Sequence, residues 1–210
     1  MAIVCPTILA ETPEDYERQI DRIAGFAERI QVDLSDGVFA PSKTVNPVQA
    51  WWPKDIAADL HMMFQRPAEH IETIISLRPS LVIIHAEAEG DLVGLVNHLK
   101  KFAIRTGVAL LADTKVEDAA SLLEIVDHAL IFSGELGHFG GKADLRLLDK
   151  AAAIREQFPD VEIGWDGGAN LDTIEALVAG GIDVVNVGGA IQRSDEPEEA
   201  YATLVAKLIK

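Results

Sequence analysis

The chain has 210 residues, of which 49% are hydrophobic, so it can build a sizeable core and is not a disordered protein. Its 34 acidic residues outnumber its 18 basic residues, which gives a formal net charge of −16. Such a charge repels phosphate backbones and anionic lipid surfaces, so we expect no nucleic acid and no membrane as a partner.

The N-terminal segment MAIVCPTILAETPED has no basic region ahead of its short apolar run. No later segment approaches 18 uninterrupted apolar residues, the length typical of a membrane-spanning helix. Cys5 is the only cysteine, which excludes an internal disulfide and is typical of a reducing compartment. We therefore expect a soluble, cytoplasmic protein without a targeting peptide.

Short apolar runs alternate along the chain with longer stretches of helical periodicity. Helices are expected after Pro13, after Pro67 and through TIEALVAGG, whose paired glycines are typical of a helix C-terminus. The predicted strands are Ile3–Leu9, Arg29–Asp33, Ala58–Met62, Leu81–His85, Gly107–Leu111, Ala129–Phe132, Val161–Asp166 and Val184–Val187.

The predicted strands are continuous apolar runs, which indicates a parallel sheet buried on both faces. Eight strand–helix units in this length predict an α/β fold with one domain over residues 1–210, a single (β/α)8 TIM barrel with eight parallel strands. A doubly wound open sheet is the alternative, although it usually has fewer strands. No Pro/Ser-rich linker divides the chain.

Two aspartates stand where predicted strands end and glycine-containing turns begin, Asp33 in RIQVDLSDG and Asp166 in VEIGWDGGAN. Carboxylates at the ends of separate strands can face one another across a pocket. Such a pair can remove a proton from one face of a substrate carbon and return one to the other face. The pair predicts an epimerase or isomerase, with Asp33 and Asp166 as the catalytic residues.

Glycine pairs follow the last three predicted strands. Glycine lets backbone N–H groups approach an anion without a Cβ in the way, and barrels commonly bind phosphate after strands 7 and 8. We therefore expect a small phosphorylated molecule as the substrate. The predicted anion-binding glycines are Gly140 and Gly141, Gly167 and Gly168, and Gly188 and Gly189.

The segments CPTILA, QVDLSDGVFAP, ADLHMM, IIHAEA, FGGK, WDGGAN and VGGAI occur in an order that resembles the ribulose-phosphate 3-epimerase family. The match runs from Ile3 to about Ile191. The resemblance implies a barrel in which two aspartates act as acid and base in the inversion of C3 of a pentulose 5-phosphate. It also implies a divalent metal, often zinc or iron, held by two histidines and those aspartates.

Carried over by position, the resemblance makes Asp33 and Asp166 both catalytic residues and metal ligands, and His61 a metal or substrate ligand. Thr7 stands where the family usually has a serine that contacts the substrate. Met63 matches a methionine that packs beside the substrate.

One position departs from the family pattern. Gln31 stands two residues before Asp33, where the resemblance implies the second metal histidine. A neutral amide oxygen is a poor ligand for zinc or iron, so an oxygen-rich set would favour manganese or magnesium. Activity without a metal and a sugar-phosphate-binding barrel without turnover both stay open as alternatives.

A rival motif is D-x-K-x-x-D, formed by Asp113, Lys115 and Asp118. It resembles the catalytic motif of phosphosugar decarboxylases and aldolases of the same barrel superfamily, but it follows the fifth predicted strand, whereas theirs lies on the third. Thr114 and Glu117 also have the spacing of a capping box, which offers a structural explanation of the acidic residues.

Trp51 and Trp52 stand in tandem and are flanked by prolines, so we do not expect both side chains to face the core. Exposed aromatic residues are typical of interfaces, so we expect a homo-oligomer. His85 in IIHAEA is expected to be a core or pocket-lining residue without an assigned role.

Overall fold

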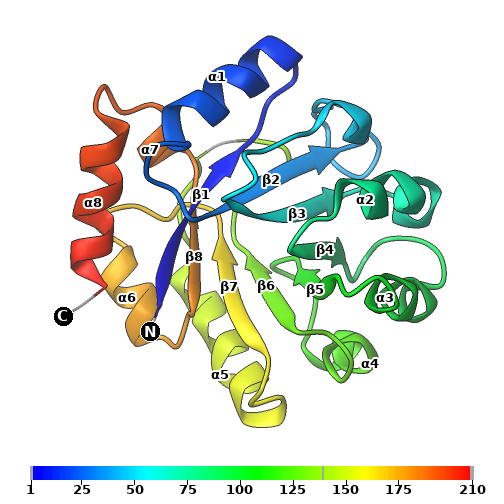
Figure 1. Cartoon of the computed structure of the whole chain (residues 1–210). Coiled ribbons are helices and arrows are strands. Elements are labelled where there is room, and N and C mark those ends of the chain that lie inside the picture. Colours follow the sequence, from blue (N-terminus) through cyan, green and yellow to red (C-terminus); the bar gives the residue numbers. More distant parts are fainter. Residues whose placement is uncertain (1, 139, 209–210) are drawn as a thin grey trace.

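The computed structural model describes residues 2–138 and 140–208. Eight parallel strands form a closed barrel in sequence order, and β1 pairs with β8 to complete it (Figure 1). Their bounds are β1 Ile3–Ile8, β2 Arg29–Ser35, β3 Ala57–Met63, β4 Leu81–His85, β5 Arg105–Leu110, β6 His128–Phe132, β7 Glu162–Asp166 and β8 Val184–Val187.

The predicted (β/α)8 barrel is confirmed, and the open-sheet alternative is wrong. Each predicted strand is present, with ends within two residues of the expected ones. The pairing between β1 and β8 excludes an open sheet, because it leaves no free edge in the strand order.

Helices lie outside the strands and cover the barrel (Figure 1). The first one begins after Thr12, whose side chain accepts a hydrogen bond from the N–H of Asp15, and Pro13 is its first residue. The α-helices are α1 Pro13–Ile23, α2 Ile71–Leu77, α3 Leu92–Lys100, α4 Ala120–Leu123, α5 Leu148–Gln157, α6 Ile174–Ala179, α7 Gly189–Gln192 and α8 Pro197–Lys207. Short 3-10 helices are η1 Pro47–Gln49, η2 Pro67–His70, η3 Glu117–Ala119 and η4 Leu145–Leu147.

The predicted helices are present at the expected positions in the chain, but some of their first and last residues differ from the expected ones. The stretch after Pro67 opens as the 3-10 helix η2 before α2. The helix through TIEALVAGG is α6, which ends at Ala179 with Gly180 as its C-cap, and Gly181 has a φ of +90°. The expected capping box at Thr114 is wrong, because the Thr114 hydroxyl instead donates to the carboxylate of Glu87.

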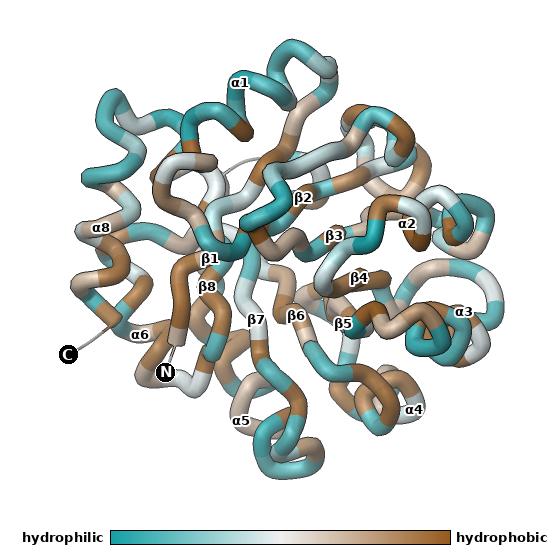
Figure 2. Tube along the Cα trace, viewed as in Figure 1, coloured by the Kyte–Doolittle hydropathy of each residue, from teal (hydrophilic) through white to brown (hydrophobic). Residues whose placement is uncertain are grey.

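The core has two parts, because successive side chains of each strand point to opposite sides of the barrel wall. Most buried apolar residues lie between the strands and the helices, and a small cluster of Leu81, Ile83, Ala109 and Leu130 lies apart from them. Figure 2 shows mostly hydrophobic residues along β4 and β8, whereas α1 is mostly hydrophilic. Polar side chains occupy much of the remaining interior.

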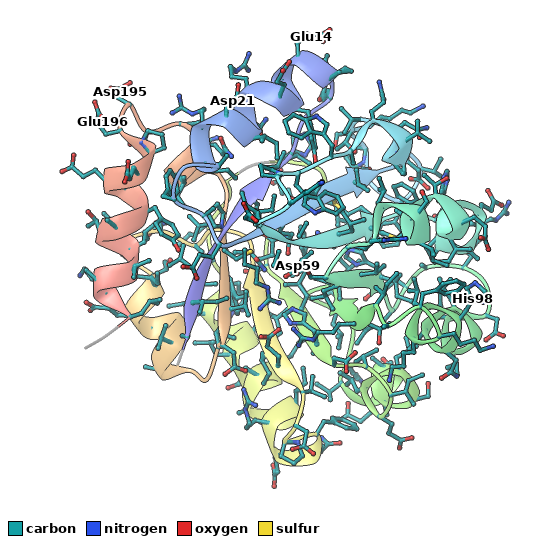
Figure 3. The ribbon with its side chains drawn as sticks, in the orientation of Figure 1. Glu14, Asp21, Asp59, His98, Asp195 and Glu196 are labelled. Atoms are coloured by element: carbon teal, nitrogen blue, oxygen red, sulfur yellow. The ribbon has the colours of Figure 1, made fainter. Side chains whose placement is uncertain are left out.

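An ion-pair network lies at the N-terminal ends of the strands. Arg29 donates to Asp59 at 2.7 Å and to Glu162 at 2.9 and 3.0 Å. His128 lies 2.8 Å from the same Glu162 carboxylate. Figure 3 shows Asp59 within the ring of strands, while Glu14 and Asp195 lie at the periphery. This network fills the end of the barrel opposite to the catalytic aspartates predicted from the sequence.

The tandem tryptophans have different surroundings. Trp51 is 45% exposed and its ring lies 6.4 Å from that of Tyr16, whereas Trp52 packs partly against the core. The two tryptophan side chains therefore do not both face the core, as expected. The homo-oligomer stays a prediction. Within the described ranges, no helix has the length and apolar character needed to cross a membrane.

Candidate active site

A cavity of about 180 Å³ opens at the C-terminal ends of the strands. It combines side chains from the strand ends with backbone from the glycine loops. Every predicted catalytic and substrate-binding residue lines it: Thr7, Asp33, His61, Met63, Gly140, Gly141, Asp166, Gly167, Gly168, Gly188 and Gly189. Gln31 lies beneath the cavity and contacts it through the two aspartates.

The two aspartates share one hydrogen-bond donor. The Nε2 amide of Gln31 donates to Oδ1 of Asp33 at 2.9 Å and to Oδ2 of Asp166 at 2.5 Å. Asp33 lies on β2 and Asp166 is the last residue of β7, so the barrel closure brings together residues 133 positions apart in the chain. The predicted meeting of the two side chains at one cavity is therefore observed.

Burial and mutual repulsion affect the charge of this pair. Burial raises the pKa of the Asp166 carboxyl, the nearby Asp33 charge raises it further, and His61 and the Gln31 amide lower it in part. Asp166 therefore holds a proton more readily than an ordinary aspartate does. A carboxyl group that holds its proton in this way can serve as the acid of an acid–base pair.

His61 connects this pair to residues behind the cavity. Its Nδ1 lies 2.9 Å from Oδ1 of Asp33, and its Nε2 lies 2.8 Å from Nε2 of His85. The β2–β3 register sets the first contact, because Asp33 and His61 are direct partners in it. His85 is fully buried and lies behind His61. Of the two expectations for His85, a core or a pocket-lining residue, its position agrees with the first.

The donor set fits a divalent cation. Ligand atoms of Asp33, His61 and Asp166 all lie within 4.8 Å of one another, and two carboxylates balance a double positive charge. The Oε1 atom of Gln31 is buried and has no hydrogen-bond partner among the described residues. A rotation of the Gln31 amide would turn this oxygen toward the carboxylates, where it can serve as a fourth ligand.

The glycines after β7 permit close contact between loops. Gly167 and Gly168 have φ values of +109° and +70°. A Cβ on Gly167 would lie 2.2 Å from the backbone nitrogen of Gly134, and one on Gly168 would lie 2.1 Å from that of Ala143. The loop after β7 can therefore pack against the loop after β6 only with glycine at these positions.

Arg193 is a cationic residue of the cavity that the sequence analysis missed. A Cβ on Gly189 would lie 2.3 Å from the Arg193 guanidinium, and one on Gly140 would lie 3.3 Å from it. The guanidinium thus lies against both glycine loops. The sequence did contain a signal for this residue. Arg193 stands four residues after Gly189, one helical turn later, so its side chain lies on the same side as that predicted anion-binding glycine.

Other lining residues were also missed, among them Phe132, His138 and Asn186. Phe132 and Asn186 are the register partners of Asp166 on either side, so the pairing of β6, β7 and β8 places them there. The rival motif lies elsewhere. Asp113, Lys115 and Asp118 are exposed, and none of the three is among the described residues that line the cavity.

A closed parallel barrel with polar side chains at the C-terminal ends of its strands defines the class of barrel enzymes whose active site lies at that end. Within this class, the chain belongs to the ribulose-phosphate 3-epimerase family, a family of isomerases, whose model matches residues 3–192.

Curated relatives agree with this assignment. The chain is 30% identical to "Ribulose-phosphate 3-epimerase" of Mycobacterium bovis, over 96% of this chain and 91% of the relative. It is 25% identical to "Ribulose-phosphate 3-epimerase" of Schizosaccharomyces pombe, over 100% of this chain and 95% of the relative. The similarity therefore extends over essentially the whole barrel.

Solved structures share the fold. 3-hexulose-6-phosphate synthase from Salmonella typhimurium superposes with a TM-score of 0.73 at 14% identity, covering 99% of both chains. KGPDC from Streptococcus mutans gives a TM-score of 0.70 at 9% identity, covering 100% of this chain and 98% of that one. At these identities the likeness supports the barrel architecture alone.

Proposed function

We propose that this chain interconverts ribulose 5-phosphate and xylulose 5-phosphate by inverting C3 through an enediolate. The observation that carries the proposal is the pairing of Asp33 from β2 and Asp166 from β7 on one Gln31 amide beside the cavity. Membership of the ribulose-phosphate 3-epimerase family supports the same reaction.

The aspartates would act in turn on opposite faces of the substrate. The carboxylate that is ionised removes the proton from C3, and the carboxyl group that is protonated returns one to the other face. The raised pKa of Asp166 and the shared Gln31 donor support a state with one proton on the pair. In the reverse direction the two residues exchange their roles.

The other end of the cavity suits a phosphate group. Glycine backbone from the loops after β6, β7 and β8 surrounds it, and the Arg193 guanidinium lies against two of these loops. Arginine donates paired hydrogen bonds to phosphate oxygens, whereas backbone N–H groups contribute weaker donors. A phosphate held there would leave the carbon chain directed toward the aspartates.

Asp33, His61 and Asp166 would hold a divalent cation, with the Gln31 amide oxygen as a further ligand. When bound, such a cation supplies positive charge that stabilises an enediolate. Because one of the expected histidines is Gln31, we propose manganese or magnesium in preference to zinc or iron. The chain's own contribution is to hold both carboxylates close together in a buried cavity.

The experiment is incubation with ribulose 5-phosphate in deuterated water, followed by proton NMR. Epimerisation with deuterium at C3 of the product is the expected result. Sugar-phosphate binding without exchange would contradict the proposal and support a barrel without turnover. Loss of a carbon fragment would instead support a decarboxylase or aldolase, although the exposed position of the D-x-K-x-x-D motif gives that reaction no catalytic group in the cavity.

A further inference from the structure

Asn186 is a buried polar residue of the cavity to which the proposed reaction gives no role. It is 2% exposed and lies on β8, between β7 and β1 in the closed barrel (Figure 1). Val185 and Val187, on either side of it in the chain, belong to the core between the strands and the helices. Because side chains alternate along a strand, Asn186 points the other way, into the interior of the barrel.

The amide oxygen of Asn186 is unpaired. Its Oδ1 atom is buried and has no hydrogen-bond partner among the described residues. Nine buried side-chain atoms of the described chain share this property, but of the residues that carry them only Asn186 lines the cavity. Buried polar atoms are nearly always paired, because an unpaired one has lost its bonds to water without replacing them. An unpaired acceptor in the wall of a cavity therefore indicates a ligand group that donates to it.

The kind of ligand group follows from the chemistry of an acceptor. On a pentulose 5-phosphate the hydroxyl groups can donate a hydrogen bond, whereas the C2 carbonyl and the ionised phosphate only accept one. The last torsion of an asparagine side chain is soft, so Oδ1 can turn toward a hydroxyl group in the cavity that Asn186 lines. The amide of Asn186 therefore suits a substrate hydroxyl, and its oxygen cannot bind the carbonyl or the phosphate.

The place of Asn186 in the cavity selects among the hydroxyl groups. Asn186 is the register partner of Asp166, and it stands two residues before Gly188, which also lines the cavity. The proposed reaction puts C3 of the sugar beside the aspartates and the phosphate, which C5 carries, against the glycine loops. C4 must then pass between Asp166 and Gly188, and Asn186 lies between these two residues.

We propose that Asn186 binds the C4 hydroxyl of the sugar phosphate and makes this group a condition of tight binding. The inference rests on the proposed function, because that function fixes which carbon faces the aspartates. C4 is not inverted in the reaction, so the same bond is made to both sugar phosphates and in the transition state between them. Such uniform binding affects KM more than kcat. Asn186 is thus a specificity-determining residue, and proton transfer stays with the two aspartates.

Binding of an unreactive ligand tests the contact. Ribitol 5-phosphate has a hydroxyl group in place of the C2 carbonyl, so it cannot form an enediolate, and calorimetry compares it with its 4-deoxy analogue. We expect the wild-type protein to bind the 4-deoxy analogue about 5–20-fold more weakly, because Oδ1 of Asn186 stays unpaired in that complex. Equal affinities of the wild-type protein for the two ligands, or no affinity for either, would overturn the proposal.

The variant Asn186→Leu removes the amide at nearly constant size. It should bind the two ligands within about twofold of one another, because leucine cannot accept a hydrogen bond from either of them. Without ligand it should unfold at the same temperature as wild type or higher, since an apolar group replaces an unpaired polar one. Asn186→Ala, which adds no bulk, should give the same ratio of affinities. A preference for the parent ligand that persists in these variants would assign the C4 hydroxyl to another residue and overturn the proposal.

The matched control is Gln192→Leu, which makes a similar change from a buried amide to an apolar side chain. The amide of Gln192 donates to the backbone carbonyl groups of Thr7 and Gln19, and Gln192 is not among the described residues that line the cavity. This variant should keep the wild-type ratio between the two ligands, even where both affinities change. Loss of the ratio in both variants would reduce the effect to a general disturbance near β8 and overturn the proposal.

Steady-state kinetics in both directions separate a binding role from a part in the chemistry. Asn186→Leu should raise KM for ribulose 5-phosphate and for xylulose 5-phosphate by the same factor of about 5–20, with kcat changed less than about threefold. A fall in kcat with an unchanged KM would overturn the proposal. Deuterium exchange at C3 reports separately on the proposed function. Exchange without a preference for the C4 hydroxyl contradicts this inference alone, whereas the preference without exchange contradicts the epimerase reaction alone.

Discussion

The substitution Gln31→Leu tests whether the Gln31 amide holds the two carboxylates together. Leucine has nearly the same size but donates no hydrogen bond. The change removes the bonds of 2.9 Å to Asp33 and 2.5 Å to Asp166. The other donor beside the pair, Nδ1 of His61, lies 2.9 Å from Asp33 but 3.8 Å from Asp166. Among the described residues, Gln31 therefore gives Asp166 its closest side-chain donor, and we expect the folded protein to lose stability by an amount that depends on pH.

The magnitude follows from the charges involved. A hydrogen bond to a charged group contributes about 1.5–3 kcal/mol to the free energy of unfolding. With both aspartates ionised, two such bonds are lost, and burial of the leucine side chain offsets on the order of 1 kcal/mol. We therefore expect a loss of about 2–5 kcal/mol at pH 9. At pH 5, Asp166 is protonated and can itself donate to Asp33, so the loss should be about 1.5–3 kcal/mol smaller.

The sign follows from the pKa of Asp166, which burial and Asp33 raise and Gln31 lowers. A carboxyl group whose pKa is raised in the folded state contributes stability at low pH, and this stability is lost as pH rises through the folded-state pKa. Without Gln31 that pKa rises further. The difference between wild type and variant must therefore grow with pH.

The assay is urea denaturation followed by circular dichroism at pH 5, 7 and 9, with a chelator present. Gln192→Leu is the matched control. Its buried amide donates to the neutral carbonyl oxygens of Thr7 and Gln19, so its effect should not vary with pH. A loss for Gln31→Leu that is equal at all three pH values, or larger at pH 5, would refute the reasoning.

Four further predictions concern single residues. Asp166→Asn should lower kcat by about 10²–10⁴-fold with an unchanged fold, because it removes a proton carrier; near-normal turnover in a coupled assay would contradict the paired-carboxylate mechanism. Gln31→His should raise the affinity for Zn²⁺ by tenfold or more in calorimetry, and an unchanged affinity would mean that the site geometry does not accept a second imidazole. Arg193→Met should raise KM for the sugar phosphate about 10–100-fold with a smaller change in kcat, since a bond to a charged phosphate is lost; an unchanged KM would remove Arg193 from the phosphate site. Glu162→Gln should destabilise the protein by about 2–4 kcal/mol at pH 7 in urea denaturation. Burial alone would raise the pKa of Glu162, but His128 and Arg29 lower it well below its ordinary value, so this stability should be present above the unfolded-state pKa and disappear as pH falls; a variant effect that persists unchanged at pH 3 would contradict it.

The sequence was enough to predict the barrel and most of the cavity. Eight apolar runs separated by helical stretches are a local signal, and each strand was found within two residues of its observed ends. Asp33 and Asp166 were recognisable because each interrupts an apolar run at the start of a glycine turn. The glycine loops were recognisable for the same local reason.

The missed residues are those whose neighbours are distant in the chain. Arg193 becomes part of the cavity only because β8 lies beside β1 and β7, which brings its guanidinium against the loop of Gly140. Thr114 fits a capping box by spacing, yet it bonds to Glu87 because β4 and β5 are adjacent. Local patterns hold no information on such contacts.

The sequence by itself determined which residues alternate into strands and helices, since periodicity and turn chemistry act over a few positions. Only the tertiary structure decided what the polar residues inside the barrel do. Gln31 looked like a poor metal ligand in the sequence, and in the fold it is the donor shared by both aspartates. The physical reason is that strand register and barrel closure set the distances between side chains, and these distances decide which group holds each proton.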